Sequence, residues 1–305
     1  MPKFRRLLVA APIAAMATVG ASSAFACPIP PPAPEYCLAL GDALSVGTQP
    51  TNSGKLVPTD QGYVDRLYAA QQRIQPRLQL VKLGCSGEST KTMLSGGTCH
   101  YDGAASQLDA AVHFLAEHRG SVRLVTLDIG ANDILPRAKN PSSFDLTCAQ
   151  NGMRDIAANL PVITSKLRAA APTANVRFAA MDYYDPLLAA SLLGPKGQPT
   201  ASASLQGIDT ANTTLRTVYT RAGFPVAPVA SGFHTRDTTP VTLPGIGELP
   251  RNVTTVCTLT WAWTPPPTGP DIHPNDARRL PDYRGRIQRR TPLEVPEPAV
   301  ADGGP

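Results

Sequence analysis

Strand-length apolar runs alternate with helical patterns along most of the chain, and this alternation limits the possible folds more than any other feature. The segments between the runs, such as YVDRLYAAQQRI and ASQLDAAVHFLAEH, repeat their apolar residues with the period of a helix. Such alternation favours right-handed βαβ units, a parallel sheet covered by helices on both faces, and a ligand site at the carboxyl ends of the strands. The predicted strands are YCLALGD (36–42), LQLVKLG (78–84), VRLVTLDIG (122–130), VRFAAMDYY (176–184) and FPVAPVAS (224–231), and the predicted helices lie within 63–74, 105–118, 153–170 and 205–219.

Length and composition fit one such domain. The chain has 305 residues, of which 42% are hydrophobic and 17% charged, enough for one sizeable core. We expect this domain to span residues 36–277, after a proline-rich leader at 27–35. The Pro-, Gly- and Thr-rich stretch from about 235 to 270 is interpreted as a long connection and not as a second domain.

Residues 1–26 have the layout of a secretory signal peptide. Lys3, Arg5 and Arg6 precede a short apolar run that ends in an A-x-A cleavage site at Ala24 to Ala26. A membrane anchor is the alternative, but Pro12 and the many small residues make the run a weak span. We therefore predict a secreted or extracytoplasmic protein with no stable membrane span after cleavage.

The formal net charge of +5 does not describe the body of the protein. Three positive charges lie in the predicted signal peptide, and residues 278–305 contain six Arg against four acidic residues. The remaining segment, 27–277, has no net charge, so the sequence shows no footprint for nucleic acid or for an anionic membrane surface.

All six cysteines follow the predicted cleavage site, and an exported chain favours disulfides over metal ligation. Cys85 and Cys99 flank a short loop rich in Gly, Ser and Thr, and we predict that they pair. The sequence does not fix the partners of Cys27, Cys37, Cys148 and Cys257.

Four short segments at the ends of these elements carry groups that acyl transfer needs. GDALSVG, after the first strand, permits a tight turn at Gly41 and directs backbone N–H groups toward an anion. LGCSGEST offers the N–H of Gly87, and DIGAND offers the side-chain amide of Asn132. GPDIHPND, near the C-terminus, offers His273 as a general base and Asp271 as the residue that orients it.

Each segment alone has an ordinary structural interpretation. A Gly-Asp turn after a strand is usually only a turn, and a His beside Pro is usually a loop residue. Asn132 or Asp133 can instead cap a following helix. The order and spacing of the four segments together are more specific than any one of them.

In this order and spacing the four segments resemble the SGNH hydrolases, also called GDSL esterases and lipases, over roughly residues 36–277. LGCSGEST, DIGAND and GPDIHPN look closest to exported actinobacterial members. The resemblance implies a short parallel sheet between helices, and therefore a three-layer α/β/α sandwich. It also implies a small-molecule ester or acylated substrate and no metal or cofactor. By position it assigns the oxyanion hole to Gly87, Asn132 and the N–H of residue 43, and the base to His273.

The position that holds the nucleophilic serine in this family is Ala43. Loss of the nucleophile in a serine hydrolase costs several orders of magnitude in rate. Ser45 would lie about 6 to 7 Å further along an extended segment, too far for His273 to serve it without rearrangement. The other interpretation of Ser45 is a hydroxyl that caps the first helix.

Two further positions depart from the family. Its orienting Asp usually lies three residues before the His, where this chain has Pro270. Either Asp271, two residues before the His, or a backbone carbonyl is then left to hold the imidazole. After HPND, related chains continue with Gly-Tyr and an apolar helix, whereas 278–305 is rich in Pro and Arg and lacks a helical period, so we expect disorder there.

A one-base frameshift would account for this tail. RRLPDYRGRIQ (278–288) can be written in synonymous codons that, shifted by one base, encode Gly-Gly-Tyr-Arg-Ile-Ile-Ala-Asp-Ala-Phe. That sequence has the Gly-Tyr and the apolar helical spacing that the resemblance leads one to expect. The codons of the gene at 278–288 test this hypothesis directly.

Two functions are consistent with these features. The first is a secreted carboxylester hydrolase, an esterase or lipase, impaired by Ala43. The second is a catalytically inactive pseudoenzyme that binds an acyl or glycan ligand. Hydrolysis of a short ester by the chain and by Ala43→Ser distinguishes them.

Overall fold

A computed structural model describes residues 33–135, 146–171, 175–243 and 247–275. The predicted signal peptide, Cys27 and the predicted frameshifted tail lie outside these residues. Within them, no helix combines the length and the hydrophobicity needed to cross a lipid bilayer.

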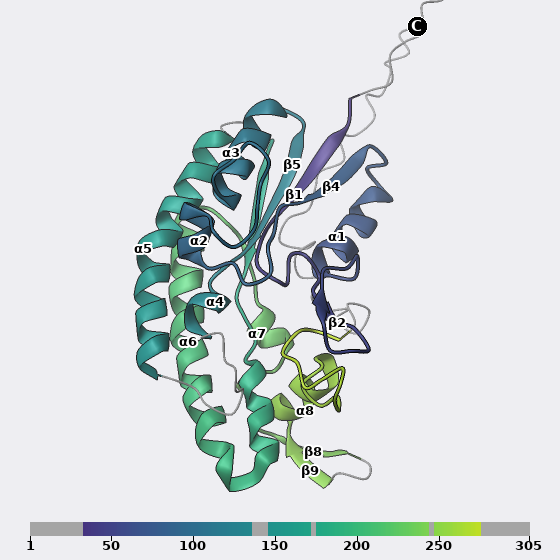
Figure 1. Cartoon of the computed structure of the whole chain (residues 1–305), viewed down its shortest axis with the longest axis vertical. Coiled ribbons are helices and arrows are strands. Elements are labelled where there is room, and N and C mark those ends of the chain that lie inside the picture. The colour runs from purple at the N-terminus through teal and green to yellow at the C-terminus, as the bar shows by residue number, and fades with distance from the viewer. Residues whose placement is uncertain (1–32, 136–145, 172–174, 244–246, 276–305) are drawn as a thin grey trace, which may run out of the picture. The chain divides into compact units, whose positions relative to one another are not determined.

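Five strands form one sheet in the order β4-β1-β5-β6-β7 (Figure 1). Every neighbouring pair is parallel, and each strand falls within one of the predicted runs or extends it by one residue. The α/β prediction is therefore confirmed. The strands are β1 (Glu35–Gly41), β4 (Leu78–Lys82), β5 (Val122–Asp128), β6 (Arg177–Met181) and β7 (Val226–Ala227).

Helices cover both faces of this sheet, which gives the predicted three-layer sandwich (Figure 1). On one face α5 packs against α2, α3, α4 and α6, and α1 lies on the other face beside β4. The helical elements are α1 (Tyr63–Gln72), α2 (Thr90–Ser95), α3 (Gln107–Glu117), α4 (Ala131–Ile134), α5 (Leu146–Ala170), α6 (Gln198–Arg221), α7 (Val229–Gly232), α8 (Arg251–Leu259) and the 3-10 segment η1 (Pro186–Lys196).

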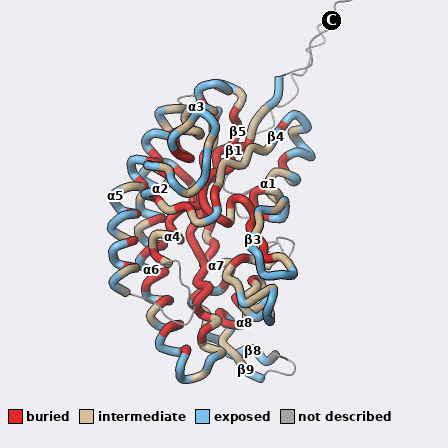
Figure 2. Tube along the Cα trace, viewed as in Figure 1, coloured by how far each residue is buried: buried red, intermediate tan, exposed pale blue. Residues whose placement is uncertain are grey.

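The core follows the central strands (Figure 2). Leu38 and Leu40 of β1, with Leu124 and Leu127 of β5, are at most 1% exposed. Each such side chain stabilises the fold by about 1.5–3 kcal/mol on burial. Because helices cover both faces, these runs are continuously apolar instead of alternating, as the sequence pattern indicated.

The interpretation of 235–270 as a plain connection is wrong. This stretch contains an antiparallel hairpin of β8 (Pro240–Leu243) and β9 (Gly247–Pro250), followed by α8. Val253 and Val256 of α8 are buried, and the helix packs against η1. Tertiary packing stabilises a helix that the local composition does not reveal.

The capping interpretation of DIGAND is also wrong. Asn132 and Asp133 lie inside α4, and the residue at its N-cap is Gly130. The side chains of both residues are therefore free of the capping role and turn to other partners, described below. A shorter antiparallel pair, β2 (Gln49–Pro50) with β3 (Leu56–Val57), completes the secondary structure that borders the site.

Candidate active site

Three of the four predicted segments lie at the carboxyl ends of neighbouring strands. Ala43 follows β1, Gly87 follows β4, and Asn132 follows β5 as part of α4. The Cys85 N–H donates to the Gly41 carbonyl at 3.0 Å, which joins the loops after β1 and β4. The sheet order therefore brings these segments together, as the alternation of elements predicts.

Gly41 forms a sharp turn at the end of β1. Its φ is +134°, and a Cβ atom there would collide with the carbonyl oxygen of Asp128, so only glycine fits. Gln107 holds the turn from both sides: its Oε1 accepts from the Gly41 N–H at 2.6 Å and its Nε2 donates to the Gly41 oxygen at 3.0 Å. Ala43 follows this turn with 8% of its surface exposed.

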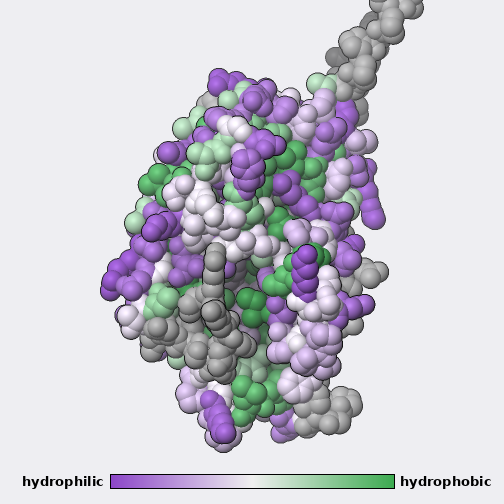
Figure 3. Space-filling model, viewed as in Figure 1, coloured by the Kyte–Doolittle hydropathy of each residue, from purple (hydrophilic) through white to green (hydrophobic). Residues whose placement is uncertain are grey.

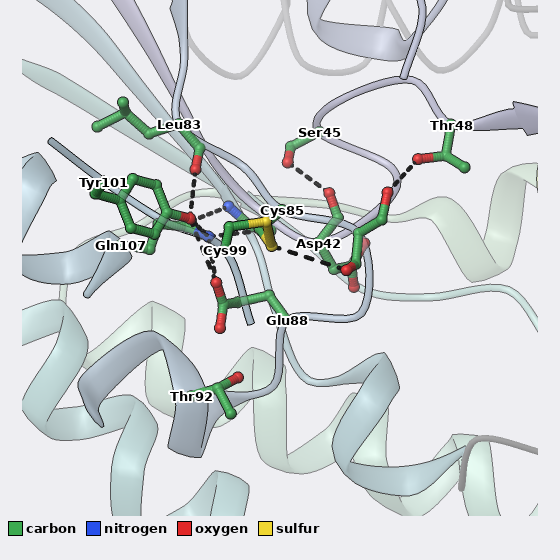
Figure 4. Close-up of a disulfide and its surroundings, with 12 residues drawn as sticks. Asp42, Ser45, Thr48, Leu83, Cys85, Glu88, Thr92, Cys99, Tyr101 and Gln107 are labelled. Atoms are coloured by element: carbon green, nitrogen blue, oxygen red, sulfur yellow. Dashed lines mark hydrogen bonds between the residues drawn. A yellow bond between two sulfur atoms is a disulfide. The ribbon is translucent and has the colours of Figure 1, made fainter. Parts of the chain in front are cut away.

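Ser45 takes neither of the roles considered from the sequence. Its side chain is fully buried, and its Oγ donates to the backbone oxygen of Asp42 at 2.8 Å (Figure 4). The hydroxyl fills the space that a side chain at Gly84 would occupy. The helix that follows, α1, begins at Tyr63 with Gly62 as its N-cap. Ser45 is thus a packing residue, neither a helix cap nor an accessible nucleophile.

Two buried carboxyl groups lie beneath the turn. Asp42 accepts from the hydroxyl of Tyr183 at 2.9 Å, and Asp128 accepts from the hydroxyl of Tyr63 at 2.6 Å. Burial raises the pKa of Asp42, opposed by its hydrogen bonds and by the charge of His273. Burial and the neighbouring charge of Asp42 raise the pKa of Asp128 well above its ordinary value. Both shifts favour retention of a proton by this pair, and the pKa of Asp128 is raised the further.

The predicted disulfide between Cys85 and Cys99 is present and closes the loop that carries Gly87 (Figure 4). Gly87 has a φ of +87°, and the nearest atom to a Cβ placed there is Thr98 Cγ2 at 3.9 Å. The backbone conformation, and not lack of space, therefore favours glycine. In the part of the chain that the structure describes, the Gly87 N–H donates to no backbone oxygen. This N–H can therefore donate to a bound ligand.

Glu88 anchors the same loop from inside (Figure 4). Its side chain is buried, and its Oε2 accepts from Gln107 Nε2 at 3.0 Å. The hydroxyl of Tyr101 lies 3.4 Å from the same oxygen and donates to the Leu83 carbonyl at 3.0 Å. Burial raises the pKa of Tyr101 to about 12, so this hydroxyl remains a donor across the physiological range.

Asn132 lies beside the Gly87 loop. Its Nδ2 donates one hydrogen to the backbone oxygen of Glu88 at 2.9 Å, which leaves the second N–H for another acceptor. Asp133 fixes α4 to α2 by accepting from the N–H and the hydroxyl of Thr90, at 2.9 and 2.5 Å. Burial raises the pKa of Asp133 to about 6.

His273 and Asp271 form a close pair. Asp271 Oδ1 lies 2.7 Å from His273 Nδ1 and accepts from the His273 backbone N–H at 2.9 Å. Burial raises the pKa of Asp271, but hydrogen bonds and charge from His273 outweigh it and bring the pKa below its ordinary value. Of the two alternatives for holding the imidazole, the structure contains the carboxylate contact. With Nδ1 directed at Asp271, Nε2 is left to accept a proton.

Side-chain hydrogen bonds attach the His273 loop to the domain. Gln49 bridges two points of it, accepting from Trp261 Nε1 at 2.6 Å and donating from Nε2 to the Pro274 oxygen at 2.7 Å. Tyr184 donates its hydroxyl to the Ile272 oxygen at 2.6 Å. These bonds place the loop above the carboxyl ends of the strands, near the turn that carries residue 43.

The sequence analysis missed Gln107 and Gln49. Gln107 has the i, i+4, i+8 spacing with Ala111 and Leu115 that marks the buried face of α3. A polar residue on a buried helix face must form hydrogen bonds there, so its position in the sequence indicates a buried hydrogen-bonding role. Gln49 carries no comparable signal, because its partners lie more than 200 positions away in the chain.

The described groups are of the kinds that acyl transfer uses. The Asn132 amide lies beside the loop of Gly87, and an imidazole in contact with a carboxylate lies close enough to the turn at Ala43 to influence the pKa of Asp42. In the described part of the chain, no group of three or more His, Cys, Asp or Glu side chains is arranged to hold a metal ion. Residues 39–277 match the sequence profile of the GDSL-like Lipase/Acylhydrolase family. The chain belongs to this family.

Solved structures share the GDSL-like fold at low sequence identity. An extracellular lipase from Streptomyces rimosus superposes with a TM-score of 0.55 at 17% identity, covering 84% of this chain and 100% of that one. A lipase from a goat rumen metagenome gives a TM-score of 0.51 at 15% identity, covering 85% and 100%. These likenesses support the fold. No curated protein is significantly similar to the chain in sequence.

Proposed function

We propose that the chain is an exported GDSL-type carboxylester hydrolase whose turnover is impaired because its nucleophile position is Ala43. The observation that carries this proposal is the fully buried Ser45. Its hydroxyl is bonded to the Asp42 backbone, so it offers no substitute for the missing oxygen. Export is supported by the signal-like N-terminus, by the Cys85–Cys99 disulfide and by the family's extracellular structural neighbour.

The remaining groups have defined roles in ester hydrolysis. With serine at position 43, His273 Nε2 accepts the hydroxyl proton while the serine oxygen attacks the ester carbonyl carbon. The N–H groups of residue 43 and Gly87, with Asn132 Nδ2, stabilise the oxyanion. His273 then protonates the departing alcohol, and a water molecule releases the acyl group by the same steps. Asp271 keeps the imidazole in the tautomer that these steps need.

Ala43→Ser tests this proposal. We expect hydrolysis of p-nitrophenyl acetate to rise by at least about 10³-fold over the unchanged chain, because the nucleophile is the missing part. Ala43→Ser with His273→Ala should return to near background, because no base then takes the proton. The matched control is Ala43→Ser with His113→Ala, since His113 lies exposed on α3. It should match the single variant.

Two outcomes contradict the proposal in different ways. Equal activity in Ala43→Ser with and without His273 would show that the base is misassigned. Activity that does not return in any serine variant would favour the alternative, a pseudoenzyme that binds an acyl or glycan ligand.

A further inference from the structure

A small apolar pocket opens beside residue 43. Ala43 forms part of its wall together with Met181 at the end of β6, Val229 of α7 and Phe233. Its volume is about 40 Å³. Gly87 and Asn132 lie in the loops after β4 and β5, whereas this pocket is lined by the segment after β1 (43–49), the start of α1, the end of β6, and α7 with Phe233.

The walls of the pocket are fixed. Met181, Val229 and Phe233 are each at most 3% exposed. The Tyr184 ring stacks on Phe233 with ring centres 4.0 Å apart and an angle of 11° between planes. Because the Tyr184 hydroxyl also bonds the Ile272 oxygen, the pocket wall and the His273 loop form one packed unit. The pocket therefore has little freedom to widen.

The direction of attack decides which part of an ester enters this pocket. Once the carbonyl oxygen points at Gly87 and Asn132, the acyl chain and the alcohol are the two remaining substituents. The alcohol must receive a proton from His273 and leave, which requires an open path. A narrow pocket whose surface is mainly apolar suits an alkyl group, since burying an unpaired alcohol oxygen there is costly.

We infer that this pocket takes the acyl group and limits the substrate to short-chain esters, from acetyl to butyryl. A water-sized group needs about 10–15 Å³ of such space, so about 40 Å³ accommodates roughly three groups of that size. This inference rests on the proposed function. It makes Met181, Val229 and Phe233 the residues that set acyl length.

A second, larger apolar cavity is the alternative binding site for an acyl chain. It lies along η1 and Trp263, has a volume of about 540 Å³ and also reaches Asp271. Leu193 and Trp263 at its border are 59% and 52% exposed, and Figure 3 shows apolar side chains in the lower part of the view, near η1 and α8. Tyr184, which lines the pocket at Ala43, donates its hydroxyl to the oxygen of Ile272, which lines this cavity. A long acyl chain would need the larger cavity.

Acyl-length profiles in the Ala43→Ser background test the inference. We expect kcat/KM for p-nitrophenyl acetate and butyrate to exceed that for the octanoate by at least about tenfold. Val229→Ala should raise the hexanoate-to-acetate ratio by about tenfold, because it removes two methyl groups from the wall and enlarges the pocket. Val162→Ala is the matched control: Val162 is exposed on α5 and should leave the ratio unchanged. An octanoate optimum, or an unchanged ratio in Val229→Ala, would overturn the inference.

A second measurement keeps the two proposals separate if Ala43→Ser hydrolyses nothing. The unchanged chain lacks the nucleophile, so its crystals can be soaked with intact p-nitrophenyl butyrate. Electron density for the butyryl group between Val229 and Phe233 would support the assignment of the pocket to the acyl group even without catalysis. The butyryl group along Trp263, or an empty pocket at saturating ester, would refute it.

Discussion

The groups at the strand ends and the imidazole on the C-terminal loop are held in different ways. Gly87 and Asn132 follow strands of the sheet, and the side chains that fix their loops, Gln107 and Glu88, are 0% and 1% exposed. His273 follows no strand of the sheet, and its loop is attached through the partly buried bonds of Gln49 and Tyr184. The proposed oxyanion donors are therefore held by fully buried side chains, and the proposed base is held by partly buried hydrogen bonds.

This difference separates stability from activity. The supports of the strand ends are part of the buried core, where removing one partner leaves others unsatisfied, so a change there should lower the stability of the whole domain. The supports of the His273 loop are hydrogen bonds that are only partly buried. A change there should displace the base by a small distance and reduce the rate while the core remains folded.

The largest effect is expected from removing the disulfide. Cys85→Ser with Cys99→Ser opens a loop whose ends are 14 residues apart, which should lower the free energy of unfolding by about 3 kcal/mol. Calorimetry should show Tm falling by about 6–12 °C. Amide exchange at Gly87 and Glu88 should accelerate before the core melts. Cys257→Ser is the control, because Cys257 is a free thiol. If the double variant has the same Tm as this control, the disulfide adds no stability to the loops at the strand ends.

The buried acid pair is expected to have an effect that depends on pH and that is smaller than the disulfide effect over any single pH unit. A carboxyl group whose folded pKa is raised stabilises the fold below its unfolded pKa, and this stability is lost as pH rises toward the folded pKa. Burial and the Asp42 charge raise the pKa of Asp128 in this way. Wild-type stability should therefore decline from about pH 4 upward, by at most about 1.4 kcal/mol per pH unit for each proton.

Asp128→Asn isolates this contribution. The amide oxygen can still accept from Tyr63, and the amide N–H can donate to Asp42 in place of the carboxyl proton. Denaturant unfolding from pH 4 to 8 should show a flatter profile for Asp128→Asn than for the wild type. Asp60→Asn is the control, because the Asp60 side chain is 97% exposed. Parallel profiles for the wild type and Asp128→Asn would contradict the shared-proton assignment.

The same two regions differ in how far the sequence predicts them. The five strands, the sheet type and the positions of Gly41, Gly87 and Asn132 follow from apolar periodicity and from turn residues, because these are local signals. The Cys85–Cys99 pairing followed from spacing and was confirmed. Local sequence patterns are therefore sufficient to predict the position of a residue that directly follows a strand of the sheet.

Local patterns were not sufficient where distant residues meet. The helix α8 is stabilised by packing on η1, and its segment was interpreted as a connection. The burial of Ser45 depends on Gly84, which lies in another segment of the chain. The contact of Asp271 with the imidazole was one of two open alternatives, since a two-residue spacing does not fix the turn between them. Each of these features required the tertiary structure.

The smallest effect is expected at Gln49, and it tests whether the His273 loop limits rate without limiting stability. In the Ala43→Ser background, Gln49→Ala removes both bridging bonds, to Trp261 and to Pro274. We expect kcat on p-nitrophenyl acetate to fall by about tenfold while Tm changes by less than about 2 °C, since the base shifts but the core remains packed. Gln49→Glu keeps the acceptor for Trp261 and loses the donor to Pro274, so an intermediate kcat would show that both bonds position the loop. Gln72→Ala, at an exposed position on α1, is the matched control and should leave kcat unchanged. If Gln49→Ala instead lowers Tm by as much as the disulfide variant does, the His273 loop is part of the cooperative core and the contrast between the two regions is wrong.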